Sequence, residues 1–348
     1  MIGSRLLFCM VLSLSVSALG QTGTAYRYFR LGSTANATAI SKPGFALMGG
    51  GADLDEAFKW LCERAGGGDL LVLRATGKDD YNSYIQKLCH LNSVATLVIP
   101  DRGAAEDPIV AQAIGHAAAL FISGGDQANY INFWQGTPVQ TALNDAIRRG
   151  VPIGGTSAGL AVLGDYAYTA QGDKPDDRDL DGKLAMADPY GPRITISHNF
   201  LEIPVLKGII TDTHFAKRDR MGRLLVFLAR LNVQDGKPLA PEQAIRGIGI
   251  EEGTALLLDT NGQGKVVGKG AAYLVDPTPA LNNAQFTDPF NKASVELESP
   301  FSLDYFNVYK VTPGGKFNLN EPLKGVNHYA LSVHAGQIHT NQAGSAIY

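Results

Sequence analysis

The sequence predicts an α/β fold: a three-layer α/β/α sandwich in which helices cover both faces of a mostly parallel sheet. From residue 43 onward, short apolar segments alternate with amphipathic ones, which is typical of strand–helix units. The apolar segments are continuous rather than alternating with polar residues, as expected of strands buried on both faces. Several of them stop at glycine-rich turns, and open α/β sheets place their sites at the carboxyl ends of such strands.

The elements of the first half follow from this alternation. Each expected strand is a short apolar run, and the expected helices carry apolar residues at helical spacing, as Ala57, Trp60 and Leu61 do. Strands are expected at 44–48, 70–74, 95–99, 118–122 and 151–153, and helices at 53–65, 81–91, 109–116, 139–149 and 158–163.

The second half is less regular. Residues 172–182 form a polar insertion, residues 219–231 predict a strongly amphipathic helix, and strands are expected at 194–196 and repeatedly beyond residue 247. A polar, proline-containing stretch at 276–304 indicates a connection to further strands. We therefore divide the chain into a signal segment (1–20), an N-terminal segment (21–42), an α/β domain (43–275) and a C-terminal β-rich appendage (276–348).

Composition excludes several classes of protein. The 348 residues include 30 Lys and Arg against 33 Asp and Glu, with 45% hydrophobic residues. High apolar content with low net charge excludes an intrinsically disordered chain. Runs of Lys and Arg never exceed two residues, so no nucleic-acid partner is expected.

Residues 1–20 have the pattern of a cleaved export signal. Arg5 precedes an apolar run at 6–16, and residues 18–20 (Ala-Leu-Gly) supply small residues at the cleavage site. The apolar run is shorter than the ~20 residues that a membrane-spanning helix needs. We therefore expect a secreted or periplasmic protein, with no membrane association after cleavage.

Two cysteines remain after this cleavage, Cys62 and Cys89, each near the end of an expected helix. An oxidising compartment permits a disulfide between them. Two separate buried thiols fit the sequence equally well, because spacing alone does not show that their Cα atoms are close.

Ser157 is a candidate nucleophile because it lies in the pattern G-x-S-x-G at 155–159, after an expected strand and before a helical run. A serine in such a tight turn has a strained backbone, and flanking glycines avoid clashes with neighbouring elements. The N–H of Ala158, at the start of the helix, is then placed to stabilise an oxyanion. The alternative is a glycine-rich turn whose serine only caps the helix.

His214 is the candidate general base among seven histidines. It closely follows the apolar run 206–211, which places it at the end of a strand, the level at which Ser157 is also expected. A histidine with a purely structural role is the alternative.

Four segments together resemble the cyanophycinase family, relatives of the aspartyl dipeptidase serine peptidases. They occur in the order GGDQ (124–127), GTSAG (155–159), DTHFAKRDRMGRLL (212–225) and GIGIEEGTAL (247–256). The resemblance covers roughly residues 43–275 and implies a fold like that of the class I glutaminases. It also implies a serine exopeptidase that releases β-aspartyl-arginine dipeptides from cyanophycin, or cleaves related aspartyl peptides. With its signal segment, the chain is then an exported member of the family.

The resemblance implies roles for individual positions. Ser157 matches the family nucleophile and His214 the general base, and the amides of Gly125 and Ala158 match the oxyanion hole. The positions that match the family's substrate pocket are Gln127, Asp212, Arg218, Arg220 and Arg223.

Two features depart from the family or stay open. Thr213 stands where the family commonly has glutamine. The family takes its triad acid from the segment between nucleophile and base, and spacing does not select among the candidates here, Asp173, Asp181 and Asp188.

Arg218 and Arg220 suit the recognition of an acidic peptide for a reason that does not depend on the resemblance. A guanidinium group binds a carboxylate through two hydrogen bonds, and an exopeptidase must recognise a free terminus or an acidic side chain. Arg218 and Arg220 are not four residues apart, so they do not share one ordinary surface stripe of a helix. We expect at least one of them to face a pocket rather than solvent.

Residues 177–182 satisfy the pattern D-x-D-x-D-G of a calcium-binding loop. The twelfth position carries an aspartate where a glutamate is usual, and flanking helices are not evident. A solvated acidic loop is the alternative. The predicted ligand positions are Asp177, Asp179, Asp181, Lys183 and Asp188.

The sequence therefore predicts a secreted serine exopeptidase that requires no cofactor and acts on a peptide or polymer with aspartyl linkages. Two alternatives remain open. One is an α/β-hydrolase-type esterase that uses Ser157 with a late histidine such as His328, and the other is a non-catalytic polymer-binding protein. The sequence leaves open whether the chain forms a homodimer.

Overall fold

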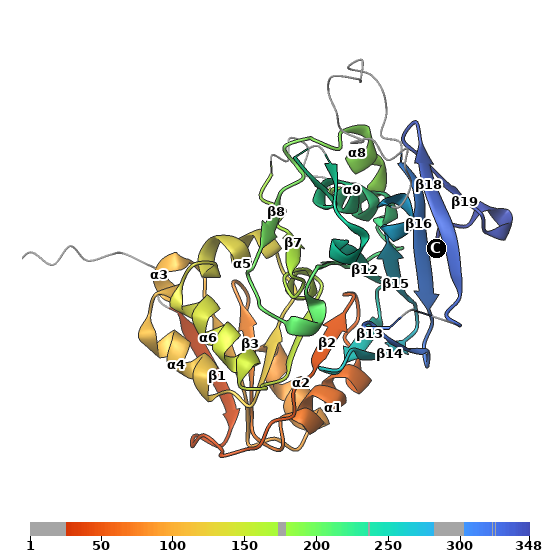
Figure 1. Cartoon of the computed structure of the whole chain (residues 1–348). Helices are drawn as coiled ribbons and strands as arrows, with labels where there is room; N and C mark the ends of the chain where they lie inside the picture. Colours follow the sequence, from red (N-terminus) through yellow and green to blue (C-terminus); the bar gives the residue numbers. More distant parts are fainter. Residues whose placement is uncertain (1–25, 173–178, 236, 282–302, 322, 324) are drawn as a thin grey trace, which may run out of the picture.

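The structure, a computed structural model, describes residues 26–172, 179–235, 237–281, 303–321, 323 and 325–348 (Figure 1). The predicted signal at 1–20 lies outside these residues, as do Asp173 and Asp177. None of the described helices has both the length and the apolar character needed to cross a membrane.

The first sheet has nine strands, and its central strands are parallel, as the continuous apolar runs predict. The order is β1-β4-β3-β5-β6-β2-β13-β14-β17. The parallel strands are β2 (Phe45–Met48), β3 (Asp69–Arg74), β4 (Ser93–Val98), β5 (Ala119–Ile122) and β6 (Ile153–Thr156). The antiparallel strands are β1 (Arg27–Gly32) at one edge, and β13 (Thr254–Leu258), β14 (Gln263–Gly268) and β17 (Lys316–Asn318) at the other.

Helices cover both faces of the first sheet. Along β2, Ala46 and Met48 belong to the apolar core under one layer of helices, whereas Phe45 and Leu47 belong to the core on the opposite face. The first layer consists of α1 (Asp55–Arg64) and α2 (Asp80–Leu88). The second layer consists of α3 (Arg102–Ala105), α4 (Pro108–His116), α5 (Gln127–Trp134), α6 (Pro138–Arg148) and α7 (Ala158–Ala161).

A second sheet of eight strands lies beside the first, in the order β19-β18-β16-β15-β12-β9-β7-β8. One of its faces packs against the first sheet through residues such as Ile248 and Leu274, and α9 covers the other face. Its strands are β7 (Tyr166–Tyr168), β8 (Ile196–His198), β9 (Ile209–Asp212), β12 (Arg246–Ile250), β15 (Ala272–Asp276), β16 (Leu303–Val311), β18 (His328–His334) and β19 (Gln337–Thr340). The remaining elements are α8 (Gly182–Ala187), α9 (Met221–Leu231), α10 (Thr278–Leu281) and the hairpin of β10 (Val233–Gln234) and β11 (Lys237–Pro238).

The C-terminal region is rich in strands, as predicted, and these strands extend both sheets. β16 pairs with β15 in the second sheet, and β17 pairs with β14 in the first. In Figure 1 the blue strands β16, β18 and β19 lie together at one end of the molecule. The predicted boundary between residues 275 and 276 falls within β15, and the division into domains stays a prediction.

The two sheets meet at the turn between β12 and β13. β12 belongs to the second sheet and β13 to the first, so residues 251–253 pass from one sheet to the other. Two main-chain hydrogen bonds join the glycine-rich end of β2 to the second sheet: the His214 N–H donates to the Gly49 carbonyl at 2.7 Å, and the Gly253 N–H donates to the Gly50 carbonyl at 2.9 Å. This seam holds the candidate site.

A disulfide joins Cys62 in α1 to Cys89 directly after α2, with their Cα atoms 6.1 Å apart. The two helices end close together on one face of the first sheet. The structure therefore favours the disulfide over two separate thiols, the two interpretations that the sequence left open. Both cysteines are buried.

Candidate active site

Ser157 occupies the tight turn between β6 and α7 with φ 52° and ψ −120°, a conformation that non-glycine residues rarely adopt. The two flanking glycines are required by space. A Cβ on Gly155 would lie 2.5 Å from the Gly159 carbonyl oxygen, and a Cβ on Gly159 would lie 2.0 Å from the Ile122 carbonyl oxygen. The local structure is therefore the strained turn that the G-x-S-x-G pattern predicts.

His214 lies two residues beyond β9, and its Nε2 is 2.7 Å from the Ser157 Oγ. The two residues come from different sheets, yet both follow the carboxyl end of a strand. His214 also has a positive φ, 48°, so two strained non-glycine residues face each other here. Such strain clusters at functional sites, where the surrounding structure imposes it.

The carboxylate that binds His214 is Glu252, whose Oε1 lies 2.6 Å from the histidine Nδ1. A carboxylate with a lowered pKa accepts hydrogen bonds, so Nδ1 carries the proton. Nε2 is then the acceptor for the Ser157 hydroxyl. Serine, histidine and glutamate therefore form one hydrogen-bonded chain, with Glu252 in the turn between β12 and β13.

The expectation that the acid lies between Ser157 and His214 in the sequence is wrong for the described candidates. Asp181 caps α8, accepting a hydrogen bond from the Leu184 N–H at 2.8 Å, and Asp188 follows the last residue of α8. Asp173 lies outside the described residues. Sequence reasoning missed Glu252, although the segment 247–256 that carries it is one of the four segments that point to the family.

Gly50 makes room for the histidine ring. A Cβ at this position would lie 2.4 Å from the His214 Cε1 and 2.5 Å from its Nε2. Its φ of 93° also favours glycine. The glycine-rich end of β2 is therefore part of the site, because it lets the main chain pass directly against the imidazole.

Electrostatics keep the imidazole neutral near neutral pH. Burial lowers the pKa of His214 below its usual 6.5; the hydrogen bond that His214 donates to Glu252 opposes this shift, and the positive charges of Arg218 and Arg220 add to it. The hydrogen bond from His214 lowers the pKa of Glu252 in turn. The pair is therefore a neutral base beside an ionised carboxylate, which is the state that proton abstraction from a serine requires.

Of the two residues matched to the oxyanion hole, Ala158 directly follows Ser157, and Gly125 follows Gly124, which lies against the serine. Ala158 is the first residue of α7, so its N–H is free of the helix's own hydrogen bonds. The Tyr130 hydroxyl lies 3.2 Å from the Gly124 carbonyl. Because the peptide is planar and trans, the Gly125 N–H points away from that carbonyl. A Cβ on Gly124 would lie 3.5 Å from the Ser157 Cβ, so this strand end adjoins the serine.

The charged residues matched to the substrate pocket form two groups, which one ion pair joins: Arg220 Nη1 lies 3.7 Å from Asp212 Oδ1. Asp212 and Arg223 bind each other, with Arg223 Nε 2.8 Å from Asp212 Oδ2 and Nη2 2.5 Å from Oδ1, and both side chains are 3% exposed. This closed pair supports the loop that carries His214. Gln127 begins α5 two residues after Gly125 and is half-buried.

Arg218 and Arg220 form the second group, and both precede α9 rather than lying on it. Arg218 Nη1 is 2.6 Å from Asp179 Oδ2, and Arg220 Nη2 is 3.3 Å from the same oxygen. Arg220 also donates through Nη1 to the Thr213 carbonyl at 2.9 Å. The two guanidinium groups therefore meet at one carboxylate oxygen of Asp179.

The predicted calcium positions are used differently where the structure describes them. Asp179 binds the two arginines, Asp181 caps α8, and Lys183 lies within α8. No group of three or more potential metal-binding side chains occurs among the described residues. The calcium loop stays a prediction, because Asp177 lies outside them.

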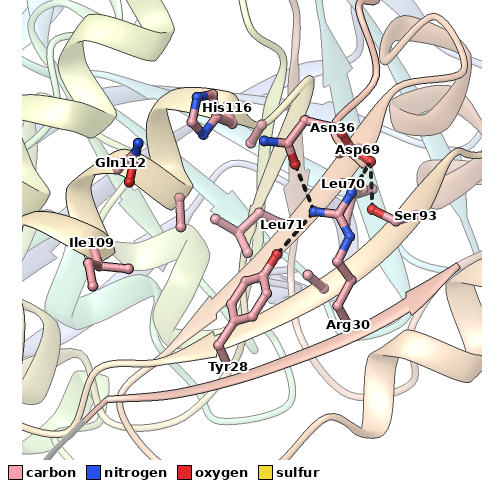
Figure 2. Close-up of a pocket in the computed structure, with 13 residues that line it drawn as sticks. Tyr28, Arg30, Asn36, Asp69, Leu70, Leu71, Ser93, Ile109, Gln112 and His116 are labelled. Carbon is pink, nitrogen blue, oxygen red and sulfur yellow. Dashed lines mark hydrogen bonds and ion pairs between the residues drawn. The ribbon is translucent and has the colours of Figure 1, made fainter. Parts of the chain in front are cut away.

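A separate cavity of about 310 Å³ lies beneath β1 and α4, at the amino ends of β3 and β4 (Figure 2). Its arginine, Arg30, is already engaged: it donates to Asp69, Asn36, Tyr28 and the carbonyls of two loop residues. A guanidinium group has five N–H donors, so these five acceptors use them all. The cluster fastens β1 to the sheet and leaves no free cation for a ligand at Arg30.

The sequence is similar to known peptidases, and the matched range includes the parallel strands of the first sheet. Residues 46–188 match peptidase family S51. The chain is also similar to cyanophycinases, and that of Synechococcus elongatus is 25% identical over 267 residues, covering 74% of this chain and 73% of its own. That of Geminocystis herdmanii strain PCC 6308 is 27% identical over 235 residues, covering 66% and 74%. That of Trichormus variabilis strain ATCC 29413 / PCC 7937 is 28% identical over 229 residues, covering 65% of each chain.

Among solved structures, the chain is similar to the crystal structure of a peptidase from an acI-B1 Actinobacterium, with a TM-score of 0.49 and 17% identity over 80% of this chain and 98% of that one. By the sequence comparisons, the chain is a serine-type peptidase related to peptidase family S51.

Proposed function

We propose that this protein is an exported serine exopeptidase that hydrolyses cyanophycin or related β-aspartyl peptides through Ser157, His214 and Glu252. The observation that carries the proposal is the hydrogen-bonded chain from the Ser157 Oγ through the imidazole to Glu252, at 2.7 and 2.6 Å. This order of nucleophile, base and orienting acid is the arrangement that activates a serine for acyl transfer.

In the first half of the reaction, the Ser157 Oγ attacks the scissile carbonyl while its proton passes to His214 Nε2. The carbonyl oxygen becomes an oxyanion, which the N–H groups of Gly125 and Ala158 stabilise. The carbon–nitrogen bond then breaks as the imidazolium returns the proton to the leaving amine. The products are a free amine and an ester on Ser157.

In the second half, water hydrolyses that ester. His214 Nε2 takes a proton from the water as the oxygen attacks, and then protonates the Ser157 Oγ as the acyl group leaves as a free acid. Glu252 holds the ring and stabilises its positive charge in both halves without itself taking the proton.

The substrate class rests on two further points. The relatives similar to this chain are cyanophycinases, and the segment that follows His214 brings Arg218 and Arg220 together close to the base. Paired guanidinium groups favour a substrate with a carboxylate near its scissile bond. Aspartyl peptides provide such a group.

Export is supported by the disulfide between Cys62 and Cys89, since such bonds persist in oxidising compartments and are rare in the cytosol. The export pattern at 1–20 is consistent with this location. The enzyme then acts on polymer released from lysed cells, or on another aspartyl peptide outside the cell.

A direct test is to incubate the purified protein with cyanophycin and with a set of β-aspartyl and ordinary α-linked peptides, and to identify released products by mass spectrometry. We expect release of β-aspartyl dipeptides, and its loss in Ser157→Ala with the fold retained by circular dichroism. His214→Ala should abolish the activity, whereas His328→Ala should not, because His328 lies in β18 and stacks on Tyr309 of β16 instead of contacting Ser157. Undiminished hydrolysis by Ser157→Ala, or cleavage of α-linked peptides alone, would contradict the proposal.

A further inference from the structure

We infer that Asp179 is a specificity-determining residue: its carboxylate competes with a carboxylate of the substrate for Arg218 and Arg220, and so sets the affinity of the site for acidic peptides. The inference rests on the proposed function, because it assigns these arginines to substrate binding. It goes further in assigning a role to the insertion between Ser157 and His214, which resemblance to the family does not explain.

Asp179 binds the arginines as a substrate carboxylate would. One oxygen, Oδ2, lies 2.6 Å from Arg218 Nη1 and 3.3 Å from Arg220 Nη2. The positive charges of Arg220 and Arg218 lower its pKa against the opposing effect of burial, so it stays ionised near neutral pH. The site therefore holds an internal anion on the two arginines that the proposed function assigns to the substrate.

The main chain around Asp179 is held firmly against α9. The Leu180 carbonyl accepts a hydrogen bond from Arg223 Nη1 at 2.9 Å, and the Gly182 N–H donates to the Asp219 carbonyl at 2.7 Å. Gly182 and Gly222 allow α8 and α9 to pack closely, since a Cβ on Gly222 would lie 2.9 Å from the Gly182 Cα. The position of Asp179 beside the arginines is thus built into the packing of α8 on α9.

The contact itself is nevertheless exchangeable. The Asp179 side chain is 59% exposed and that of Arg218 is 42% exposed, so solvent screens their attraction. Exposed ion pairs of this kind contribute little to stability. Asp212 and Arg223 are the contrast: both are 3% exposed and bound through two hydrogen bonds, so a ligand has no access to either.

Arg220 also has an unsatisfied donor beside Asp179. Its side chain is 8% exposed, and its Nε is buried without a hydrogen-bond partner among the described residues. Asp179 reaches Arg220 through a single oxygen at 3.3 Å and leaves Nε unsatisfied. A carboxylate that binds both Nε and Nη2 makes the stronger two-point contact. A substrate carboxylate that displaces Asp179 and reaches Nε therefore gains a hydrogen bond that Asp179 does not make.

If Asp179 competes in this way, its neutral isostere Asp179→Asn should bind acidic ligands more tightly. We propose to measure by calorimetry the binding of β-aspartyl-arginine, and of the same dipeptide with both carboxyl groups converted to amides, to the full chain carrying Ser157→Ala. The free acid should bind Asp179→Asn about two- to five-fold more tightly, a change on the scale of one exposed ion pair. The diamide should show no gain.

Asp188→Asn is the matched control, because it removes an exposed carboxylate at the other end of α8, away from the contacts that Asp179 makes with the two arginines. It should leave binding of the acid unchanged. Adding Arg218→Gln to Asp179→Asn should cancel the gain. Thermal unfolding should show that all variants fold.

Unchanged or weaker binding of the acid by Asp179→Asn would overturn the inference, and so would an equal gain for the diamide or for Asp188→Asn. Failure of the acid to bind either protein would overturn it too. The proposed function is judged separately by hydrolysis with Ser157 intact. Hydrolysis without tighter binding by Asp179→Asn refutes only the role of Asp179, and tighter binding without hydrolysis refutes only the peptidase proposal.

Discussion

Glu252 and His214 stand at the same level of the second sheet because each lies two residues beyond the end of one of two adjacent parallel strands, β12 and β9. Asp212 at the end of β9 pairs in register with Gly249 of β12, so both chains leave the sheet side by side. The 2.6 Å contact between the Glu252 carboxylate and the imidazole follows from that register.

This relationship predicts the effect of removing the carboxylate charge. Glu252→Gln retains the shape of the side chain but no longer holds the Nδ1–H tautomer or stabilises the imidazolium. We expect kcat to fall about 10²- to 10⁴-fold with little change in KM. Steady-state kinetics on a β-aspartyl substrate test it. Glu251→Gln is the neighbouring control, because Glu251 binds Tyr273 and the Ala271 N–H instead. A Glu252→Gln enzyme with normal kcat would contradict the role.

The lowered pKa of His214 predicts the acid side of the pH profile. The reactive form is the neutral imidazole, so kcat/KM should persist below pH 6.5 and fall only as the pH drops through the lowered pKa. Arg218→Gln removes a positive charge that disfavours the imidazolium, so it should raise this pKa and move the fall in activity to higher pH. Measuring kcat/KM between about pH 4 and 8 tests both statements. A shift to lower pH in Arg218→Gln would contradict them.

Gly50 predicts a steric effect on catalysis. In Gly50→Ala, the new Cβ would approach the His214 ring to 2.4 Å, so the imidazole must move away from Ser157. A displacement of about 1 Å in a catalytic group lowers kcat by about 10²-fold. Gly67→Ala is a matched control, because Gly67 has a similarly positive φ of 78° but open space around the position of a Cβ. Comparable losses of kcat in both variants would show that backbone strain, and not the ring contact, is responsible.

The disulfide predicts a stability that depends on redox conditions. It closes a loop between residues 27 positions apart, and breaking a bond of this span costs about 3 kcal/mol of unfolding free energy. We expect a reductant to lower Tm by several degrees and to leave kcat unchanged at temperatures where the protein stays folded. In Cys62→Ala/Cys89→Ala, the reductant should have no effect. A wild-type Tm insensitive to reductant would contradict the prediction.

Much of the first sheet is predictable from the sequence because its strands are buried on both faces and its helices cover them. The expected strand at 44–48 and helix at 53–65, for example, correspond to β2 and α1 within two residues. β1 was not expected, because it is half-exposed at the edge of the sheet and carries arginines. α5 was also missed, since its apolar face is aromatic and mixed with polar residues.

The residues of the candidate site could be predicted where a short stretch of sequence identifies them. Ser157 lies in a five-residue pattern, and His214 follows an apolar run, so both positions carry their own signal. Glu252 carries none, because its contact depends on the pairing of β9 with β12, which are separated along the chain by α9 and the β10–β11 hairpin. Likewise, the buried pair of Asp212 and Arg223 is set by the docking of α9, which no local pattern reveals.

The seam between the two sheets has a consequence for when the enzyme is active. The serine follows a strand of the first sheet, whereas the histidine and the glutamate follow strands of the second. A molecule in which the two sheets have come apart does not bring Ser157 and His214 together, so the proposed nucleophile–base pair exists only when both sheets are in place. Under the proposed function, hydrolysis therefore reports the docking of the two sheets as well as the folding of each.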